Sequence, residues 1–459
     1  MNRWLVPGAV ALTVALATVT AGLLPPQTAP PVELPPDSSR VSLVCPSFSS
    51  ATASVRVVAA TSGAALRTAP LSKPGREDEA SGVAKLQDAA EPVRISGSRS
   101  DAFGGATVVT AGSGPERGLS ASGCQTPRTD HWFPGLGLSG DTQAELLLAN
   151  LDAAEAAVDV TVWSDQGRLA APGSRGLIVA GHSQRTVSVG QLVRSDTPLT
   201  LLVRTSQGRV AAFLRERQWQ GSTPLGAEWI APTDAPAAEV VIAGIPQGAG
   251  RRELVVANPG ERTAGVRIEV LGTSGRTAIA GHETMDLPAG TTRSVDLTAG
   301  LAEQAGSLRL EATQPITAAL RLTRPDGSRP GDPALATASG ALASTTLLPV
   351  PIPSGGTAVL IMANPGTQDA AAAVTVSDDA GTPADPTQVR IPAGASALVP
   401  LDRARTAVVR VQTDSPGVRA AVVITGEVDG VRGLATLGLG SGQVPRQAPV
   451  LRFDPHVGG

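Results

Sequence analysis

Two cysteines, Cys45 and Cys124, are the first residues in the chain that could do chemistry. Two thiols can form a disulfide or bind a metal, and a single thiol can carry a lipid. A metal would need further ligands at a suitable spacing, and His131 is the sole candidate nearby. Lipidation usually uses a cysteine directly after an apolar leader, whereas Cys45 lies well beyond it. Because thiols of an exported chain most often pair, we predict a disulfide between Cys45 and Cys124.

Four histidines could bind a metal or transfer protons: His131, His182, His282 and His456. The sequence contains no HExxH pattern and no histidine at a useful spacing from a pair of carboxylates. His182 and His282 both follow Ala-Gly, but they hold different positions in the repeat described below. We therefore expect solvent-exposed loop histidines and no metal site.

Residues 135–140 (GLGLSG) fit the pattern G-x-G-x-x-G, which binds a dinucleotide when it joins a strand to a helix. The residues that follow, Ala144–Leu148, have the pattern of a strand, so we interpret 135–140 as a linker. The chain has no GxSxG elbow, phosphate-binding loop or calcium loop. We predict that the protein is not an enzyme and uses no cofactor.

Carboxylates and tryptophans leave one enzymatic alternative open. Asp141, Asp378 and Asp379 look like isolated surface groups, and nothing in the sequence supports a paired-carboxylate glycosidase site among them. Four tryptophans could stack on sugar rings, but we interpret them as core or junction anchors. They are Trp132, Trp163, Trp219 and Trp229.

Three asparagines recur in one short phrase, and the chain has only one other, Asn2. They are Asn150, Asn258 and Asn364, of which the second and third are followed by Pro259 and Pro365. Their spacings are 108 and 106 residues, which indicates an internal repeat. An asparagine side chain can bond to the backbone two residues on, and proline fixes φ, so we interpret the phrase as a turn marker. A ligand contact repeated in each module is the alternative.

Composition favours short strands for the elements that position these residues. The core must be built from Val, Leu, Ile and Ala, because the chain has 5 Trp, 5 Phe and no Tyr. Its 51 Gly and 38 Pro leave little room for long helices. With 37 basic and 40 acidic residues, the net charge is −3, which argues against a nucleic-acid surface.

Spacings after each asparagine support the same repeat. The next turn glycine (Gly167, Gly275 or Gly381) follows its asparagine by 17 residues in all three modules. In Ala156–Ser164, valines alternate with polar residues, which is the pattern of a half-buried strand. About seven such strands per repeat predict an all-β protein of tandem, immunoglobulin-like β-sandwich repeats of about 106 residues. A closed β-architecture with two blades in each repeat is the less favoured alternative.

One period before Asn150 lies Cys45, where Pro46 matches Pro259, so we predict a fourth, diverged repeat at the N-terminal end. Proline-stopped segments at Trp132–Pro134, Trp229–Pro232 and Leu347–Pro349, together with Leu451–Phe453, are interpreted as closing strands. The predicted division is 1–24 as a signal peptide or membrane anchor, 25–37 as a proline-rich stalk, 38–134 as the diverged β module with both cysteines, and 135–232, 233–351 and 352–455 as three further β modules.

The N-terminal segment predicts export. Arg3 precedes twenty uncharged residues, Leu5–Leu24, which would form a hydrophobic helix. This stretch suits either a cleaved signal peptide or a membrane anchor. In either case Arg3 holds the N-terminus in the cytoplasm, and we expect everything after it to be extracytoplasmic.

The chain resembles an actinobacterial secreted or membrane-anchored family known only as a domain of unknown function. The features that carry the resemblance are the N-terminus expected to direct export, the cysteine-containing first module and the L-x-x-A-N-P-G strands. The chain departs from the phrase at Leu151, which stands in the place of proline. The resemblance implies an envelope location and no known catalysis. We expect a non-enzymatic scaffold or binding protein of the cell envelope, with an envelope protein or glycan as partner. The alternative is an envelope-polymer hydrolase with a site between modules.

Overall fold

The structure is a computed structural model that describes residues 40–63, 65–327, 329–378, 380–401 and 406–440. The predicted leader, the predicted stalk, Leu451–Phe453 and His456 lie outside these residues. Residues 40–459 fall in one compact unit, and the description below concerns this unit. No helix in the described part of the chain is long and apolar enough to cross a membrane.

Strands make up 62% of the structure and helices 2%, and the strands pair antiparallel, so the all-β prediction is confirmed. In the first repeat the strands are β1 (Arg40–Cys45), β2 (Ser54–Thr61), β3 (Leu66–Pro70), β4 (Asp78–Ala80), β5 (Val83–Gln87), β6 (Val93–Ser98), β7 (Phe103–Ala111) and β8 (Gly118–Gly123). They form two sheets, with the orders β1-β6-β3-β4 and β5-β2-β7-β8.

The second repeat adds one strand to this plan. Its elements are β9 (Asp130–Leu136), β10 (Thr142–Asn150), β11 (Ala156–Ser164), β12 (Gly167–Leu169), β13 (Leu177–Val179), β14 (Ser183–Ser188), α2 (Val189–Leu192), β15 (Leu199–Gln207), β16 (Ala211–Gln220) and β17 (Thr223–Ile230). The sheets are β12-β11-β15-β9, with β13 beside β11, and β14-β10-β16-β17.

In the third repeat one long strand serves both sheets. The elements are β18 (Ala237–Ile245), β19 (Arg252–Asn258), β20 (Ala264–Gly272), β21 (Gly275–Ala278), β22 (Thr284–Leu287), β23 (Thr291–Asp296), α3 (Thr298–Leu301), β24 (Gly306–Asp326) and β25 (Arg329–Thr337). The first half of β24 pairs with β18 and β20, and its second half pairs with β19 and β25.

The fourth repeat returns to the plan of the first. Its strands are β26 (Thr345–Pro351), β27 (Thr357–Asn364), β28 (Ala370–Ser377), β29 (Thr387–Ile391), β30 (Ala395–Pro400), β31 (Thr406–Gln412), β32 (Arg419–Val428) and β33 (Val431–Leu439). The sheets have the orders β26-β31-β28-β29 and β30-β27-β32-β33.

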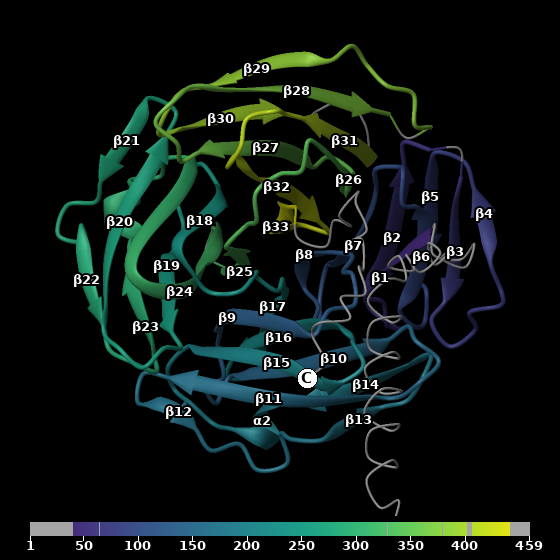
Figure 1. Ribbon diagram of the computed structural model, residues 1–459, viewed down its shortest axis with the longest axis horizontal. Coiled ribbons are helices and arrows are strands. Elements are labelled where there is room, and N and C mark those ends of the chain that lie inside the picture. Colours follow the sequence, from purple (N-terminus) through teal and green to yellow (C-terminus); the bar gives the residue numbers. More distant parts are fainter. Residues whose placement is uncertain (1–39, 64, 328, 379, 402–405, 441–459) are drawn as a thin grey trace, which may run out of the picture. The chain divides into compact units, whose positions relative to one another are not determined.

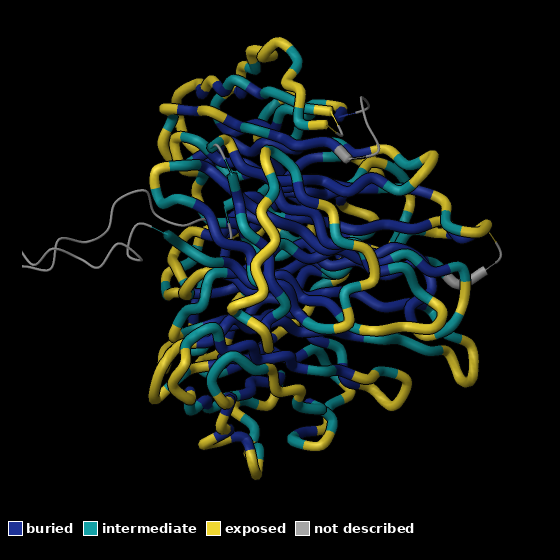
Figure 2. The backbone as a smooth tube through the Cα atoms, turned by 90° about the vertical axis from the view of Figure 1, so that its right-hand side faces the viewer, coloured by how far each residue is buried: buried dark blue, intermediate teal, exposed yellow. Residues whose placement is uncertain are grey.

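Each repeat buries apolar side chains from both of its sheets, which is the sandwich-like packing expected from the sequence. In β11, for example, Val158, Val160 and Val162 are buried and the residues between them are half-buried. This follows from strand geometry, because alternate side chains point to opposite faces of a sheet. Figure 2 shows the same distribution, with buried strands inside and exposed residues mainly in the connections.

The four repeats close into a ring (Figure 1). The last strands of the repeats form its inner cycle, because β8 and β25 each contact both β17 and β33. Apolar side chains fill all four junctions. The sets are Val44, Leu71, Leu147, Phe213 and Trp229 between the first and second repeats, Ala319 and Leu335 against the core of the second, Val241, Leu271 and Ala363 between the third and fourth, and Ala60, Ala102, Leu347 and Val408 between the fourth and first. The repeats therefore close, as in the less favoured alternative, but each repeat is a two-sheet sandwich and not the pair of blades that this alternative assumed.

Two of the predicted closing strands open the next repeat instead. Trp132–Pro134 lies in β9, which pairs with β15, and Leu347–Pro349 lies in β26, which pairs with β31. Trp229 and Ile230 do lie in a last strand, β17. The prediction took each proline as the end of a strand. Pro134 and Pro349 instead lie within strands whose pairing continues past them.

Candidate functional site

The asparagines of the recurring phrase occupy the same structural position in three repeats. Each ends the second strand of its repeat and is almost fully buried. In Asn258, Nδ2 donates to the carbonyl oxygens of Arg262 at 2.7 Å and Leu287 at 3.1 Å, and Oδ1 accepts from the amide of Gly260 at 3.1 Å. Asn150 and Asn364 repeat this pattern with their own loops. The side chain thus ties the turn to the end of a neighbouring strand.

Asn364→Ala is expected to lower the free energy of unfolding by about 2 kcal/mol, because it leaves one buried carbonyl, one partly buried carbonyl and one partly buried amide group without their partner. The carbonyl oxygens are those of Gln368 and Ile391. Denaturant titration of the purified protein measures the loss. Gln368→Ala is the matched control, because Gln368 is exposed and contributes only its backbone carbonyl. Equal stability of the two variants would contradict this role.

Cys45 and Cys124 form a disulfide in the first repeat. The bond joins the end of β1 to the residue after β8 and lies in the core of that repeat. Gly105 has to be a glycine here, since a Cβ at this position would lie 2.5 Å from the Cys124 sulfur and 3.0 Å from the Cys45 sulfur.

Cys45 does not stand in the position of the asparagines, contrary to the sequence alignment. Thr61 ends β2, the second strand of the first repeat, and its Oγ1 accepts from the amide of Gly63 at 3.0 Å, as Oδ1 of Asn258 does from Gly260. The prediction failed because it assumed a constant period. Thr61 precedes Asn150 by 89 residues, fewer than the later spacings.

His131 is buried in β9, so the expectation of an exposed loop histidine is wrong for this residue. Its Nε2 lies 2.8 Å from the carbonyl oxygen of Val210, and its Nδ1 has no partner in the structure. Burial, followed by the charge of Arg128, lowers the pKa of His131 to about 3. His182 and His282 are partly exposed.

Acid should destabilise the protein through His131. Its folded-state pKa is below the ordinary 6.5, so the unfolded chain binds a proton between these values and the folded chain does not. Stability is therefore expected to fall as the pH drops from about 6.5 towards 3. His131→Gln keeps a donor for the Val210 carbonyl and should lose less stability over this range. The free energy of unfolding of the parent and of His131→Gln is measured at pH 7 and pH 4.5. An equal loss of stability in both proteins would refute the assignment of this pH dependence to His131.

The tryptophans pack inside the protein or at junctions. Trp132 and Trp163 stack with ring centroids 5.3 Å apart and form a cluster with Leu202. Trp229 meets Phe213 edge-on at the junction of the first and second repeats. Trp219 is half-buried. These rings act as packing anchors, as the sequence suggested.

The centre of the ring contains a buried carboxyl group that no sequence motif indicated. Asp332 of β25 is fully buried, and its Oδ2 accepts from the amide of Leu119 in β8 at 3.2 Å and from that of Leu434 in β33 at 2.8 Å. Gly226 of β17 also faces it, because a Cβ there would lie 3.0 Å from Oδ1. One side chain therefore contacts the inner strands of all three other repeats.

Glu228 of β17 is a second buried carboxyl group near this centre. Burial raises its pKa well above the ordinary value, and the charge of Asp332 raises it further. Burial likewise raises the pKa of Asp332. Oε2 of Glu228 and Oδ1 of Asp332 have no hydrogen-bond partner. Both groups therefore hold their proton more strongly in the folded protein than in the unfolded chain.

A small cavity of about 60 Å³ lies beside Glu228, between the second and third repeats. Glu216 and Arg321 also line it, and they form a paired contact across the junction at 2.6 and 3.0 Å. Glu216 accepts from the amide of Gly137 at 2.7 Å as well. Both carboxylate oxygens are therefore occupied by structural partners.

Three more arginine–carboxylate contacts join distant parts of the chain. Arg117 binds Asp326 at 3.0 Å and the carbonyl oxygen of Leu225 at 3.1 Å. Glu116 contacts Arg215 and also binds Arg217 at 2.7 Å. These pairs join the loop before β8 to the second and third repeats.

Arg215 is itself almost fully buried, and its guanidinium lies 3.6 Å from the centre of the Phe48 ring. Burial, followed by the neighbouring charge of Arg217, lowers the pKa of Arg215 to about 8. This arginine packs at the junction of the first and second repeats.

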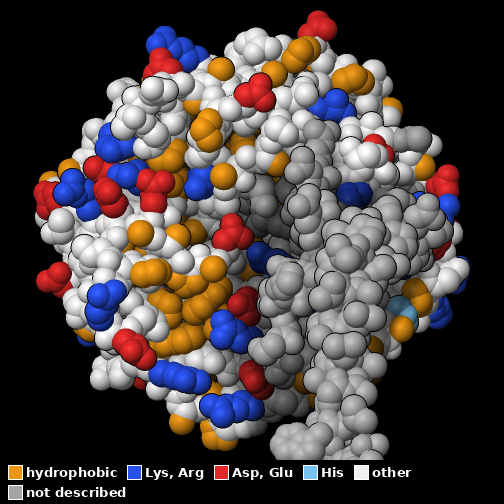
Figure 3. All heavy atoms as spheres, in the orientation of Figure 1, with side chains coloured by type: hydrophobic (Ala, Val, Ile, Leu, Met, Phe, Trp, Pro, Cys, Tyr) orange, Lys and Arg blue, Asp and Glu red, His pale blue; other side chains and the backbone are white. Residues whose placement is uncertain are grey.

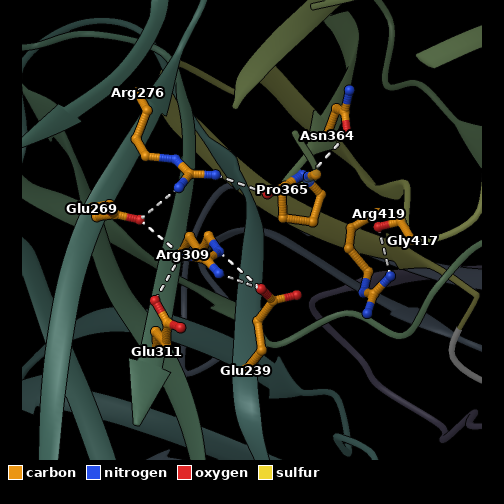
Figure 4. Close-up of polar contacts among 10 residues, drawn as sticks. Glu239, Glu269, Arg276, Arg309, Glu311, Asn364, Pro365, Gly417 and Arg419 are labelled. Carbon is orange, nitrogen blue, oxygen red and sulfur yellow. Dashed lines mark hydrogen bonds and ion pairs between the residues drawn. The ribbon is translucent and has the colours of Figure 1, made fainter. Parts of the chain in front are cut away.

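A further network lies on the third repeat and extends to the fourth (Figure 4). Arg309 binds Glu239 at 2.7 Å, Glu269 at 2.9 Å and Glu311 at 3.1 Å. Arg276 bonds to the carbonyl oxygen of Pro365 at 2.8 Å, which anchors the turn after Asn364 to the third repeat. The carboxylates here surround an arginine rather than an open position.

The remaining candidates from the sequence are a metal site and the GLGLSG segment. Within the described residues, no group of three or more histidine, cysteine or carboxylate side chains could hold a metal. Gly135 of the GLGLSG segment lies in β9 and packs against Ala319 and Leu335, and strand β10 follows the segment. On the face drawn in Figure 3, acidic and basic side chains are interspersed.

The sequence matches the family of unknown function (DUF5719) over residues 80–402. The chain belongs to this family. The match begins at the last residue of β4 and extends into the fourth repeat, so it includes the Asn150, Asn258 and Asn364 turns and the Asp332 centre. The expected relation to a family of unknown function is thus confirmed. No curated protein matches the chain.

Proposed function

We propose that the protein is a non-enzymatic scaffold or binding protein of the cell envelope. One observation carries this proposal: ionisable side chains at the ring's junctions bind partners from other repeats. Glu216 and Arg321 join the second and third repeats, and Asp332 joins the third to the first and fourth. Such contacts fix the relative positions of the repeats, which is what a rigid scaffold requires.

The compartment is part of the same proposal. The Cys45–Cys124 disulfide supports an extracytoplasmic location, because such bonds persist mainly in oxidising compartments. The sequence of residues 1–24 supports it independently. A fusion of alkaline phosphatase to the C-terminus tests the location, since this enzyme is active only after export. Activity equal to that of a fusion lacking residues 1–24 would refute the proposal.

Partners are tested by crosslinking in the native envelope, followed by identification of the captured proteins and glycans. A scaffold should capture the same envelope components in independent preparations. Asn364→Ala, which loosens one turn, and Gln368→Ala serve as the sensitive and control variants. The scaffold role would be contradicted if the protein captures no envelope component in larger amount than an unrelated exported protein does.

A second candidate is a hydrolase of envelope polymers, favoured by the two carboxyl groups, Glu216 and Glu228, in the cavity between the second and third repeats. The raised pKa of Glu228 suits a general acid. Against it, Glu216 is occupied by Arg321, and about 60 Å³ is far smaller than the pockets that hold drug-sized ligands. Release of soluble fragments from purified cell wall, abolished by Glu228→Gln, would establish this candidate and overturn the first.

A further inference from the structure

A cavity of about 210 Å³ lies where the third and fourth repeats meet, away from the predicted site residues. One wall is the loop 246–250 (PQGAG), which joins β18 to β19. The end of β24 forms another wall through Leu322–Pro325, and Arg432 and Leu434 of β33 contribute from the fourth repeat. The cavity is smaller than the roughly 300–1,000 Å³ of pockets for drug-sized ligands, so its size suits a single small group.

The walls of this cavity carry four arginines and no carboxylate. They are Arg251, Arg252, Arg324 and Arg432. Carboxylates approach from outside the walls: Glu253 pairs with Arg251 at 3.3 Å, and Glu427 lies opposite Arg432 across the β32–β33 hairpin. The lining itself is therefore positively charged.

Two of these arginines are held in place by backbone carbonyl groups. Arg252 is buried and donates to the carbonyl oxygens of Pro246 at 2.8 Å and Gly248 at 2.6 Å, which fixes the loop. Arg324 donates through Nη1 to the carbonyl oxygens of Gly426 at 3.1 Å and Gly433 at 2.6 Å. These guanidinium groups are thus oriented before any ligand arrives, which lowers the entropic cost of binding.

Arg324 and Arg432 also repel each other. Burial lowers the pKa of Arg324, and the charge of Arg432 lowers it further, although Asp332, Asp326 and Glu427 act in the opposite direction. An anion between two such groups removes this repulsion. The planar fork of arginine can donate two parallel hydrogen bonds to the oxygens of a phosphate or a carboxylate, and a phosphoryl group offers oxygens to more than one arginine at once.

We propose that this cavity binds a phosphoryl group, either as inorganic phosphate or as a phosphate ester carried on a larger molecule. Arg251 and Arg432 are exposed and close the site from the solvent side, while Arg324 forms its inner wall. The glycines of the loop let the backbone lie close to β24, because a Cβ on Gly250 would collide with the carbonyl oxygen of Thr323. The site does not depend on the envelope location proposed above.

Isothermal titration of the full chain with inorganic phosphate, and separately with a hexose phosphate, tests the site at constant ionic strength. One phosphoryl group should bind per chain. Arg432→Gln should weaken binding at least tenfold, and the Arg251→Gln/Arg432→Gln double variant should abolish it. Arg168→Gln, which changes an exposed arginine of β12, is the matched control and should bind like the parent.

The two titrants distinguish the source of the ligand. Tighter binding of inorganic phosphate identifies the free ion, and tighter binding of the hexose phosphate identifies an ester. Thermal unfolding without ligand verifies that the exposed substitutions leave the fold intact. The proposal would be overturned if neither titrant binds, or if the parent and the double variant bind with equal affinity. Neither result would bear on the scaffold proposal, which rests on other residues.

Discussion

Asp332→Leu is expected to lower the free energy of unfolding by about 4 kcal/mol, because it leaves two buried amide groups without an acceptor. These amides belong to Leu119 and Leu434, in the first and fourth repeats. Asp332→Asn keeps an acceptor oxygen for both amides and should cost far less. The comparison separates the hydrogen bonds from the volume of the side chain, and denaturant titration at pH 7 measures it.

The pH dependence gives an independent test of Asp332. Burial raises its pKa, so the folded chain binds this proton more strongly than the unfolded chain and the contribution to stability is present at low pH. This contribution is lost as the pH rises through the raised pKa. The parent protein should therefore lose stability towards alkaline pH more steeply than Asp332→Asn. Glu228 contributes in the same direction, so Glu228→Gln/Asp332→Asn should have the flattest profile. A leucine variant as stable as the asparagine variant would contradict the role of Asp332.

Removal of the disulfide is the second large effect. Replacing both cysteines by alanine should lower the free energy of unfolding by about 4 kcal/mol, because the bond restricts a long loop in the unfolded chain. Cys45 and Cys124 are separated by 79 residues. The measurement compares the free energy of unfolding of the parent, under oxidising and under reducing conditions, with that of the Cys45→Ala/Cys124→Ala variant.

Reduction supplies the internal control for this second prediction. The reductant should destabilise the parent and leave the double alanine variant unchanged. Thiol titration of the denatured, unreduced protein should find no free thiol. Two free thiols per chain would disprove the disulfide.

Local features of the fold could be predicted from the sequence because they depend on neighbouring residues. The alternation in Ala156–Ser164 predicted strand β11, and the spacing of Asn150, Asn258 and Asn364 predicted equivalent turns. Each depends on the geometry of a few adjacent residues. The disulfide was predictable for another reason, since the chain has only two cysteines and thiols of a chain expected to be exported most often pair.

Ring closure could not be predicted in this way, because it depends on contacts between residues that are far apart in sequence. Arg117 meets Asp326 across 209 positions, and Leu119 meets Asp332 across 213. No periodic pattern marks Asp332 or Glu228, which are single carboxyl groups in otherwise ordinary strands. His131 was placed in a loop for a similar reason, as nothing in its own segment indicates that Val210 covers it.

Small-angle scattering of residues 40–440 tests the central claim, that the four repeats close into one ring, most directly. A compact unit of this length should have a radius of gyration of about 21 Å. Four separate modules of about 100 residues in a row should give roughly 35 Å. We predict the smaller value, with a single cooperative unfolding transition in the same sample. A radius near the larger value would contradict the closed ring, and with it the structural role assigned to Asp332.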